Sequence, residues 1–331
     1  MSKENSYEVA EEKISLRLAH EDDPVFIVGA ARSGTTLLQY MLRSHPALSL
    51  PTGESHFFIP FYERSEEFGD LGDPENLRRA LEEVYEFKRN FFDEEFHGIK
   101  FDVEWLHGQL ISAGCRNIAD MISMIFQLNA RGENKQRWGD KTPYYILHLD
   151  TLLTMFPRAK VVHIIRDGRD CALSMLQRKW DLKIFNVYHA AYLWRRYVEA
   201  GRAFGRDHPE RYFEIRYEDL LSDPEGEMEK LCNYLGIEFS DSVINYKKTT
   251  VGQKTPLLAQ PLKRDNMYKW KEKMSPADIR IFESMSGDAL AACGYERTHP
   301  NVRPTFLEKI VGEGQIRLGY FWDRHVRSRL K

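Results

Sequence analysis

The sequence has few cysteines, no long apolar run and no strong excess of charge of either sign. Its four cysteines are scattered without the spacing of metal ligands, so the sequence predicts neither a disulfide framework nor a zinc site, and we expect a reducing compartment. No stretch approaches the length of a membrane span, and residues 1–23 form a polar, acidic extension without an apolar core. We therefore expect a cytoplasmic protein.

The charge balance and the absence of repeats exclude further classes of protein. A formal net charge of −3 argues against a general nucleic-acid binder and leaves anion binding to local clusters of cations. The sequence contains neither an internal repeat nor a low-complexity linker. With 331 residues, of which 42% are hydrophobic, the chain is long enough to bury a sizeable core in one large α/β domain.

The most informative segment is an apolar stretch that runs into a turn bounded by two glycines. Residues 24–28 have the pattern of a strand, and Gly29 and Gly34 bound a turn in front of a helix start. In such a turn successive backbone N–H groups converge on one point, toward which the positive end of the helix is also directed. The segment is therefore predicted to cradle a phosphate-like anion.

This turn lacks the lysine of a nucleoside-triphosphate loop. The spacing is that of G-x-x-x-x-G-K-[ST], but Thr35 stands where the lysine would follow Gly34, and the nearest cation is Arg32 inside the turn. A lysine together with an acid that binds Mg²⁺ suits a triphosphate, whereas this turn suits a smaller anion without an obligatory metal. The predicted anion-binding residues are Arg32, Ser33, Gly34, Thr35 and Thr36.

A second anion site is predicted at the end of another apolar strand. Residues 161–165 lead into Arg166, and Gly168 opens a helix on which Ser174 lies about two turns along. Ligands of open parallel sheets bind at the carboxyl ends of the strands, so we expect Arg166 and Ser174 to share a phosphate. The alternative is a surface salt bridge among the charged residues of segment 166–170.

Together the two sites resemble those of the sulfotransferases that use 3′-phosphoadenosine 5′-phosphosulfate (PAPS). In that family the 5′-phosphosulfate loop often reads R-S-G-T-T, and a strand ending in arginine, with a serine eight positions later, binds the 3′-phosphate. Residues 32–36, Arg166 and Ser174 match these patterns. The resemblance implies PAPS as co-substrate, no metal, and a P-loop-like three-layer α/β fold with a central, mostly parallel sheet flanked by helices.

Two further segments carry the residues that the resemblance implies to be catalytic. A hydroxyl acceptor loses its proton as it attacks, so a base is needed near the sulfur. Residues 54–58 are similar to the E-x-H-F-F segment of heparan sulfate 3-O-sulfotransferases, in which the glutamate is the base. We assign Glu54 as the base and keep His56 as the alternative base, or as the group that orients Glu54.

Lys141 lies in a segment that resembles the K-[TS]-P segment of glycan sulfotransferases. With Arg32, it is predicted to stabilise the charge that develops on the departing nucleotide. The alternative for Lys141 is a solvated lysine in front of a helix, because Thr142 and Pro143 form a good N-cap and first turn.

Two later residues are candidate ligands of the nucleotide. Residues 211–220 have the pattern of a strand, followed by a helix through Leu235 that Gly236 ends. This segment is similar to one in tyrosylprotein sulfotransferases whose tyrosine contacts the cofactor, which makes Tyr217 a candidate; the alternative is a core tyrosine. Lys269 lies in a segment similar to the late loop of the family that folds over the nucleotide, although it also has the pattern of an ordinary helix start.

We divide the chain into the N-terminal extension, a sulfotransferase domain at 24–300 and a basic amphipathic segment at 301–331. Within the domain, residues 62–137 are expected to form a mostly helical insertion that shapes the acceptor site, with a buried helix over 118–128. The C-terminal segment is expected to pack on its own domain, or to dock on an acidic membrane surface or a second subunit.

The sequence alone does not identify the acceptor substrate. A glycan, a lipid, a tyrosine and a small alcohol or phenol all offer the hydroxyl that the family uses. Two other functions are alternatives to sulfuryl transfer. A P-loop-like nucleotide kinase would need the missing lysine and a metal-binding acid at the end of a strand, which we do not find in the expected place. A non-catalytic nucleotide-binding module would use the anion sites alone.

Overall fold

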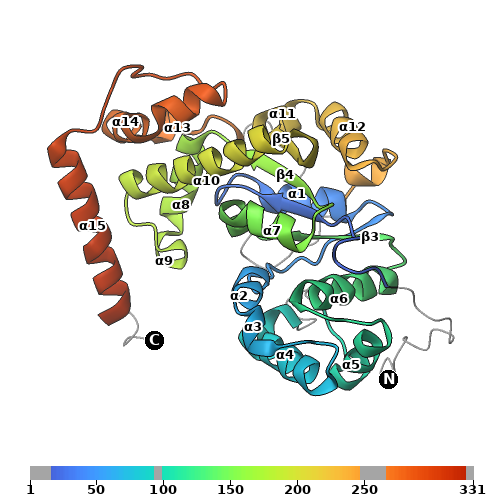
Figure 1. The fold of residues 1–331 in the computed structure, drawn as a ribbon. Helices are drawn as coiled ribbons and strands as arrows, with labels where there is room; N and C mark the ends of the chain where they lie inside the picture. The colour runs from blue at the N-terminus through green and yellow to red at the C-terminus, as the bar shows by residue number, and fades with distance from the viewer. Residues whose placement is uncertain (1–15, 93–98, 247–265, 326–331) are drawn as a thin grey trace, which may run out of the picture. The chain divides into compact units, whose positions relative to one another are not determined.

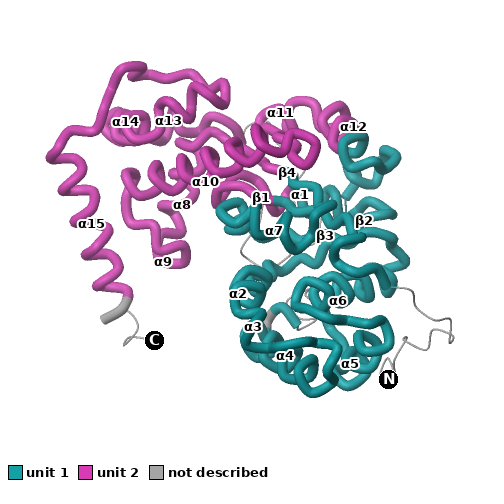
Figure 2. Tube along the Cα trace, in the orientation of Figure 1, with its two compact units in different colours: residues 1–27, 38–162, 232–247 teal, residues 28–37, 163–231, 248–331 magenta. Residues whose placement is uncertain are grey.

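The computed structural model describes residues 16–92, 99–246 and 266–325 (Figure 1). The chain divides into two compact units (Figure 2). Unit 1 comprises residues 1–27, 38–162 and 232–247, and unit 2 comprises residues 28–37, 163–231 and 248–331. Because each unit is assembled from segments far apart in sequence, neither corresponds to a continuous stretch of chain.

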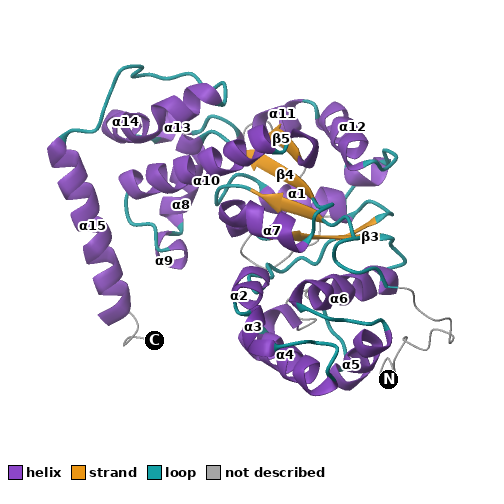
Figure 3. Ribbon diagram, viewed as in Figure 1, coloured by secondary structure: helices purple, strands orange, loops and turns teal. Residues whose placement is uncertain are grey.

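A five-stranded sheet, mostly parallel and flanked by helices, forms the centre of the fold (Figure 3). The strand order is β2-β3-β1-β4-β5. The five strands are β1 (Val25–Val28), β2 (Leu48–Ser49), β3 (Arg137–Lys141), β4 (Lys160–Ile165) and β5 (Tyr212–Arg216). The structure thus confirms the predicted α/β class, including the strands expected at 24–28, 161–165 and near 211–220.

Strand β3, like the short strand β2, is an element that the sequence analysis did not anticipate. It pairs in parallel with β1, with Phe26 opposite Asp140 and Ile27 opposite Lys141, and on its other side it pairs with β2. All five of its residues are buried although three of them are charged. Because strands are usually found by apolar or alternating patterns, a charged strand of this kind gives no periodic signal.

The core of unit 1 is aromatic. Phe26 of β1 meets Trp138 of β3 edge-to-face, with ring centroids 6.0 Å apart, and Phe58 meets Phe126 in the same way at 5.2 Å. Such contacts add to the stabilisation that burial of the rings supplies. The unit 1 helices are α2 (Phe58–Glu63), α3 (Ser65–Phe68), α4 (Pro74–Phe87), η1 (Arg89–Phe92), α5 (Val103–Ser112), α6 (Ile118–Gly132), η3 (Pro143–His148), α7 (Leu149–Met155) and η5 (Asp241–Val243).

Several helices of unit 1 begin where their sequence predicts. Asp73 caps α4 through the N–H groups of Glu75 and Asn76, with Pro74 in the first turn. Asn117 caps α6, the buried helix expected over 118–128. Helix α1 (Thr35–Arg43) starts directly after the glycine-bounded turn and connects the two units along the chain.

Unit 2 is built around helix α10 (Val187–Asp207), which packs against α14 (Pro276–Ala292) and α8 (Gly168–Gln177). Its other helices are α9 (Lys179–Leu182), η4 (Pro209–Arg211), α11 (Tyr217–Ser222), α13 (Trp270–Lys273) and α15 (Phe306–His325), and α12 (Pro224–Leu235) runs from unit 2 into unit 1. As expected, Gly236 follows α12 with a φ of 72°, the left-handed conformation that ends helices.

We predict that Gly168→Ala destabilises the protein by about 1–3 kcal/mol, because the added methyl group overpacks the core of unit 2. A Cβ at residue 168 would lie 2.5 Å from ring atoms of both Phe282 and Trp194. Urea unfolding followed by circular dichroism measures the change.

Gly314→Ala is the matched control for this substitution. Its Cβ would meet nothing within 4 Å, and the residue lies inside a helix, so we expect stabilisation of up to about 1 kcal/mol. Equal stability of the Gly168→Ala variant and the wild-type protein would contradict the predicted overpacking.

Candidate active site

Two glycines define the turn between β1 and α1 for separate steric reasons. Gly29 has a φ of +155°, and a Cβ there would lie 2.5 Å from the carbonyl oxygen of Ile164. Gly34 has a φ of +105°, and its Cβ would lie 2.5 Å from the ring of Tyr217. Any other residue at either position would push the turn away from its neighbours, so the backbone of the predicted phosphate loop depends on both glycines.

Arg32 occupies a strained position in this loop. Its φ of 70° lies in the left-handed region, which a non-glycine residue adopts only at a cost in free energy. Its Nε donates a hydrogen bond to Oγ of Ser174, at 2.9 Å. Burial lowers the pKa of Arg32, and the positive charges of Arg178 and Arg166 lower it further. The loop therefore concentrates positive charge, as an anion site requires.

The polar side chains of the loop itself are also largely enclosed. Ser33 is buried, and among the described residues its Oγ has no hydrogen-bond partner. Thr35 is buried as well. A buried hydroxyl without a partner costs free energy, so Ser33 is suited to donate to a bound anion.

Arg166 follows β4 and is held by three different kinds of partner. Its guanidinium lies over the ring of Tyr217 at 4.6 Å, and one Nη donates to the carbonyl oxygen of Asn266 at 2.6 Å. The carboxylate of Asp170 lies 3.3 Å from the same nitrogen. Nε of Arg166 is buried and has no partner among the described residues. The side chain is thus oriented while keeping a donor available.

The charged residues of segment 166–170 do pair, Arg166 with Asp170 and Arg169 with Asp167, but these ion pairs are buried and not at the surface, where the alternative raised from sequence placed them. Arg169 is 1% exposed and pairs with Asp167 at 2.8 Å and with Glu283 at 2.6 Å, both of them fully buried. Arg169 is therefore paired with two buried carboxylates inside unit 2, whereas Arg166 is paired with one.

Ser174 and Tyr217 lie with the anion-site residues, but Ser174 has a different partner from the one expected. Ser174 contacts Arg32 of the loop, and no hydrogen bond between Ser174 and Arg166 is present among the described residues. Tyr217 is 6% exposed, and its hydroxyl accepts a hydrogen bond from the side-chain amide of Asn266 at 2.7 Å. It is therefore both a buried tyrosine and a neighbour of the anion site.

Lys269 directly precedes α13 and is half-buried, and residues 260–265 of its segment lie outside the described residues. The start of α13 is fixed by Asp170, which accepts the backbone N–H of Trp270 at 2.9 Å. Sequence reasoning missed both Asp170 and Asn266. Asp170 gave a weak signal, because it lies four residues after Arg166 at a helix start, whereas Asn266 gave none.

In unit 1, Glu54, His56 and Lys141 form a second cluster. Nζ of Lys141 lies 2.5 Å from Oε1 of Glu54, and Nε2 of His56 lies 2.9 Å from Oε2 of Glu54. The Lys141 side chain is only 4% exposed, so the alternative of a solvated lysine is wrong. His56 has a φ of 57°, a second strained backbone among the candidate residues.

The electrostatics of this cluster favour an ionised Glu54. Burial of the Glu54 carboxyl group raises its pKa. The charge of Lys141 and the hydrogen bond to His56 lower it by more than that, so the pKa of Glu54 falls to about 2. Glu54 is therefore an ionised carboxylate at neutral pH, able to accept a proton, yet a weak base while Lys141 stays beside it.

A hydrogen-bond network fixes the backbone of this cluster. The N–H of Ser55 donates to Oγ1 of Thr142 at 3.0 Å, and the hydroxyl groups of Ser55 and Tyr145 lie 2.8 Å apart. The hydroxyl of Tyr145 also accepts the N–H of Phe58 at 3.1 Å. Thr142 therefore does not cap the following helix through its side chain, as its sequence suggested, but anchors Glu54 and His56 next to Lys141.

Asp140 is a second residue that sequence reasoning missed. It is 1% exposed, and burial raises its pKa to about 6. It lies one residue before the end of β3, the parallel neighbour of β1. An acid thus does stand near the end of a strand beside the phosphate-loop strand, contrary to the expectation from sequence. The phosphate-loop lysine of a kinase is still replaced by Thr35.

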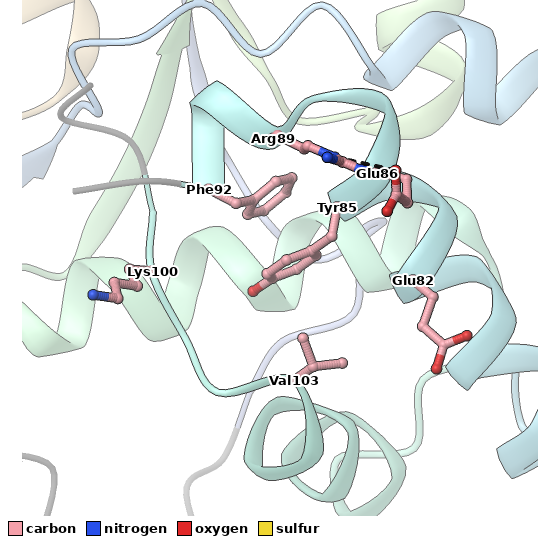
Figure 4. A pocket seen from close by; sticks show the side chains of 7 residues that line it. All are labelled: Glu82, Tyr85, Glu86, Arg89, Phe92, Lys100 and Val103. Carbon is pink, nitrogen blue, oxygen red and sulfur yellow. Dashed lines mark hydrogen bonds and ion pairs between the residues drawn. The ribbon is translucent and has the colours of Figure 1, made fainter. Parts of the chain in front are cut away.

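Unit 1 also holds a pocket of about 690 Å³ among its helices (Figure 4). The rings of Tyr85 and Phe92 stack there with their centroids 4.1 Å apart, and Arg89 pairs with Glu86. The pocket shares no residue with the Glu54 cluster. It is lined by Glu82, Tyr85, Glu86, Arg89, Phe92, Lys100 and Val103.

The predicted residues therefore gather in two groups. Arg32, Ser33, Thr35, Arg166, Ser174 and Tyr217 lie in unit 2, and Glu54, His56 and Lys141 lie in unit 1. Among the described residues, none of the helices is long and apolar enough to cross a bilayer.

Known proteins resemble this chain over most of its length. A family model described as "Sulfotransferase family" matches residues 24–241. Protein-tyrosine sulfotransferase 1 of Danio rerio is 24% identical over 293 residues, which cover 85% of this chain and 73% of the relative. The omega-hydroxy-beta-dihydromenaquinone-9 sulfotransferase Stf3 of Mycobacterium bovis is 25% identical over 335 residues, which cover 88% of this chain and 79% of the relative.

Solved structures share the fold. The sulfotransferase domain from the curacin biosynthetic pathway superposes with a TM-score of 0.60 and 20% identity, covering 83% of this chain and 99% of the domain. The sulfotransferase domain of the Synechococcus PCC 7002 olefin synthase gives a TM-score of 0.55 and 24% identity, covering 82% of this chain and 98% of the domain.

Since the family match covers well over half of the chain, the protein belongs to the sulfotransferase family. The predicted enzyme class, a PAPS-dependent sulfotransferase, is confirmed at the level of the family. The matched region contains both candidate clusters. Lys269, the further candidate ligand, lies outside it.

We predict that Lys141→Met raises the pKa of Glu54 from about 2 to its ordinary value of 4.5 or above, because the main group that lowers it is lost while burial persists. Carboxyl ¹³C NMR over a pH series measures the titration. Lys230→Met, which removes an exposed ammonium paired with Glu227, is the control and should leave Glu54 unchanged. A pKa that stays near 2 in the Lys141 variant would show that Lys141 does not set it.

Proposed function

We propose that this protein transfers the sulfuryl group of PAPS to an acceptor hydroxyl, with Glu54 as the base and without a metal ion. The observation that carries the proposal is the sulfotransferase family match over residues 24–241, which includes the phosphate loop, the Glu54 cluster and Arg166. The two charged clusters have the composition that such a transfer needs, namely cations for the donor and a carboxylate for the acceptor proton.

The donor is assigned to the residues of unit 2. Arg32, Ser33 and the backbone N–H groups of the loop would hold the 5′-phosphosulfate, and Arg166, assisted by Tyr217, would hold the 3′-phosphate. Support comes from the unpartnered Oγ of Ser33 and Nε of Arg166, which are buried donors. Ser174 would orient Arg32, to which it is hydrogen-bonded. Lys269 is retained as a further candidate ligand.

Glu54 is assigned as the base because it is ionised and fixed by two partners. In the proposed reaction Lys141 gains a second anionic partner, the departing 3′,5′-bisphosphate nucleotide. When Lys141 turns toward that anion, it lowers the pKa of Glu54 by less than in the resting site. The Glu54 carboxylate therefore becomes a stronger base as the leaving group develops charge. His56 orients Glu54 through the hydrogen bond of 2.9 Å and is the alternative base.

The acceptor class is a hydroxyl-bearing molecule, and two of the relatives favour particular kinds. The names of these relatives specify a protein tyrosine and an omega-hydroxy-beta-dihydromenaquinone as acceptors. We propose a phenolic or lipid-borne hydroxyl for this chain, and propose that segment 62–137 shapes the site that recognises it.

We predict that Glu54→Gln lowers turnover by about two to four orders of magnitude, because the amide cannot accept the acceptor proton. Affinity for 3′,5′-ADP, measured by calorimetry, should stay nearly unchanged. The radiolabel of [³⁵S]PAPS transferred to extracted lipids or tyrosine peptides measures turnover. Glu83→Gln, which removes a carboxylate paired with Arg64, is the control. Turnover like that of the wild type in the Glu54 variant would refute the base assignment.

A second prediction concerns the donor site. Wild-type protein should bind 3′,5′-ADP more tightly than 5′-AMP, and Arg166→Met should abolish that preference, a loss of about 10- to 100-fold, because a charged hydrogen bond to the 3′-phosphate is removed. Calorimetry with EDTA present tests the absence of a metal at the same time. Arg206→Met, an exposed arginine of α10, is the control.

The two alternatives predict different calorimetric results. A kinase would bind ATP tightly and only with Mg²⁺. A non-catalytic binding module would keep the preference for 3′-phosphate but show no transfer, even with the wild-type Glu54. Metal-independent binding of 3′,5′-ADP together with sulfuryl transfer supports the proposed function against both.

A further inference from the structure

Asp140 is a buried carboxyl group to which the reaction described above gives no role. It lies in β3, where it is opposite Phe26 of the parallel strand β1. Its side chain is buried, and among the described residues neither of its carboxylate oxygens has a hydrogen-bond partner. An ionised carboxylate in such a place costs free energy, so either a proton or a nearby donor must compensate the charge.

Two hydroxyl groups beside Asp140 belong to the hydrogen-bond network that fixes the Glu54 cluster. Burial raises the pKa of Asp140 to about 6, and the hydroxyls of Thr142 and Ser55 are the groups that oppose this rise most. The charges of Lys141 and His56 oppose it less. The carboxyl group of Asp140 is therefore next to the residues that anchor Glu54, and Thr142 is its foremost polar neighbour.

A count of donors in this network leaves one hydroxyl hydrogen for Asp140. A hydroxyl group carries one hydrogen and two acceptor sites. Oγ1 of Thr142 accepts the backbone N–H of Ser55 at 3.0 Å, and the hydroxyls of Ser55 and Tyr145 lie 2.8 Å apart and satisfy one another. The contact between the hydroxyls of Ser55 and Thr142, at 3.3 Å, is longer than an ordinary O–H···O bond. The hydrogen of the Thr142 hydroxyl is therefore available for the carboxylate of Asp140.

The bond between Thr142 and the N–H of Ser55 fixes the backbone between the two candidate bases. Ser55 stands between Glu54 and His56, and His56 has a φ of 57°, a conformation that persists only where the surrounding contacts impose it. Nε2 of His56 in turn lies 2.9 Å from Oε2 of Glu54. A change in the hydrogen bonding of Thr142 therefore changes how firmly the carboxylate of Glu54 is held.

We propose that Asp140 is a positioning residue for the base, an inference that rests on the proposed function. When Asp140 is ionised, its carboxylate accepts the hydroxyl hydrogen of Thr142. Oγ1 of Thr142 is then free to accept the N–H of Ser55, which keeps Glu54 and His56 in place. When Asp140 is protonated, it becomes a donor that competes with the N–H of Ser55 for Oγ1 of Thr142, and the segment is released.

This role of Asp140 gives turnover an acid limb that Glu54 alone does not produce. The pKa of Asp140 is about 6, whereas that of Glu54 is about 2. The ionisable groups that face Asp140 are Lys141 and His56, which favour its ionised form, and Tyr145, whose pKa is raised by burial and by the charge of Asp140. We expect turnover to fall about tenfold or more from about pH 7.5 to about pH 5, because a charge-assisted hydrogen bond is lost.

Turnover of Asp140→Asn with [³⁵S]PAPS over the same pH range tests this expectation. The amide is uncharged at every pH, so the variant should be about tenfold or more slower than wild type near pH 7.5 and within about threefold of it near pH 5. Affinity for 3′,5′-ADP should stay nearly unchanged. Asp150→Asn, the same change at an exposed aspartate of α7, should keep the wild-type profile. An acid limb that persists in Asp140→Asn would belong to another group, such as His56, and would overturn the proposal.

The pH dependence of stability is a readout that does not require catalysis. Because the pKa of Asp140 is raised from 3.8 to about 6, the folded protein binds this proton more tightly than the unfolded chain does, and it loses stability as the pH rises from 3.8 through about 6. Asp140→Asn lacks this loss, so its urea midpoint relative to wild type should rise over that range. A difference between the two midpoints that does not change with pH would show that Asp140 does not titrate there, and would contradict the proposed role.

The backbone N–H of Ser55 reports the coupling itself in the wild-type protein. Its chemical shift in ¹H–¹⁵N NMR spectra should titrate with a midpoint of about 6, the pKa of Asp140. Thr142→Val removes the hydroxyl and should abolish this titration, whereas Thr142→Ser keeps the hydroxyl and should retain it. A Ser55 signal that is independent of pH, or that titrates equally in Thr142→Val, would overturn the coupling. The expected titration without sulfuryl transfer at any pH would support the coupling and refute the proposed function.

Discussion

The ion pair between Lys141 and Glu54 is the interaction on which the candidate chemistry depends. A lysine side chain that is 4% exposed needs a counter-charge, and the carboxylate of Glu54 supplies it at 2.5 Å. The pair also links stability to pH. The pKa of Glu54 in the folded protein is about 2, below its ordinary value of 4.5, so the stabilisation is complete above 4.5 and is lost as the pH falls toward 2. The interaction that stabilises the resting site therefore also limits the basicity of Glu54.

The arginines of unit 2 show how a buried cation is kept available for a ligand. Arg169 is neutralised by two fully buried carboxylates, Asp167 and Glu283, and so has a structural role. Arg166 is instead held by a carbonyl oxygen, an aromatic ring and a single carboxylate at 3.3 Å. Partners that orient a guanidinium without fully cancelling its charge leave a positive potential for an anion.

Much of the fold and of the candidate residues was predictable because their signals are local. The strand, turn and helix around Gly29 and Gly34, and the strand before Arg166, follow from apolar runs and glycines in a short window. Asp140 and Asn266 were missed for a different reason. Asp140 lies in a strand of charged residues, and Asn266 meets Arg166 from a distance of one hundred residues along the chain. No pattern within a segment encodes such contacts.

Helix α15 shows that the periodic pattern of apolar residues in a sequence does not always predict which side chains are buried. The sequence shows an amphipathic segment, and the usual inference would place its large apolar residues against the domain. The inward side is set instead by Gly312 and Gly319, since only residues without a side chain let the backbone approach the rings of Tyr188 and Phe185. Close approach through small residues competes with the burial of large ones, and here the close approach leaves large apolar residues of α15 such as Leu307, Leu318 and Trp322 exposed. A pattern that specifies two faces thus does not specify which of them is covered.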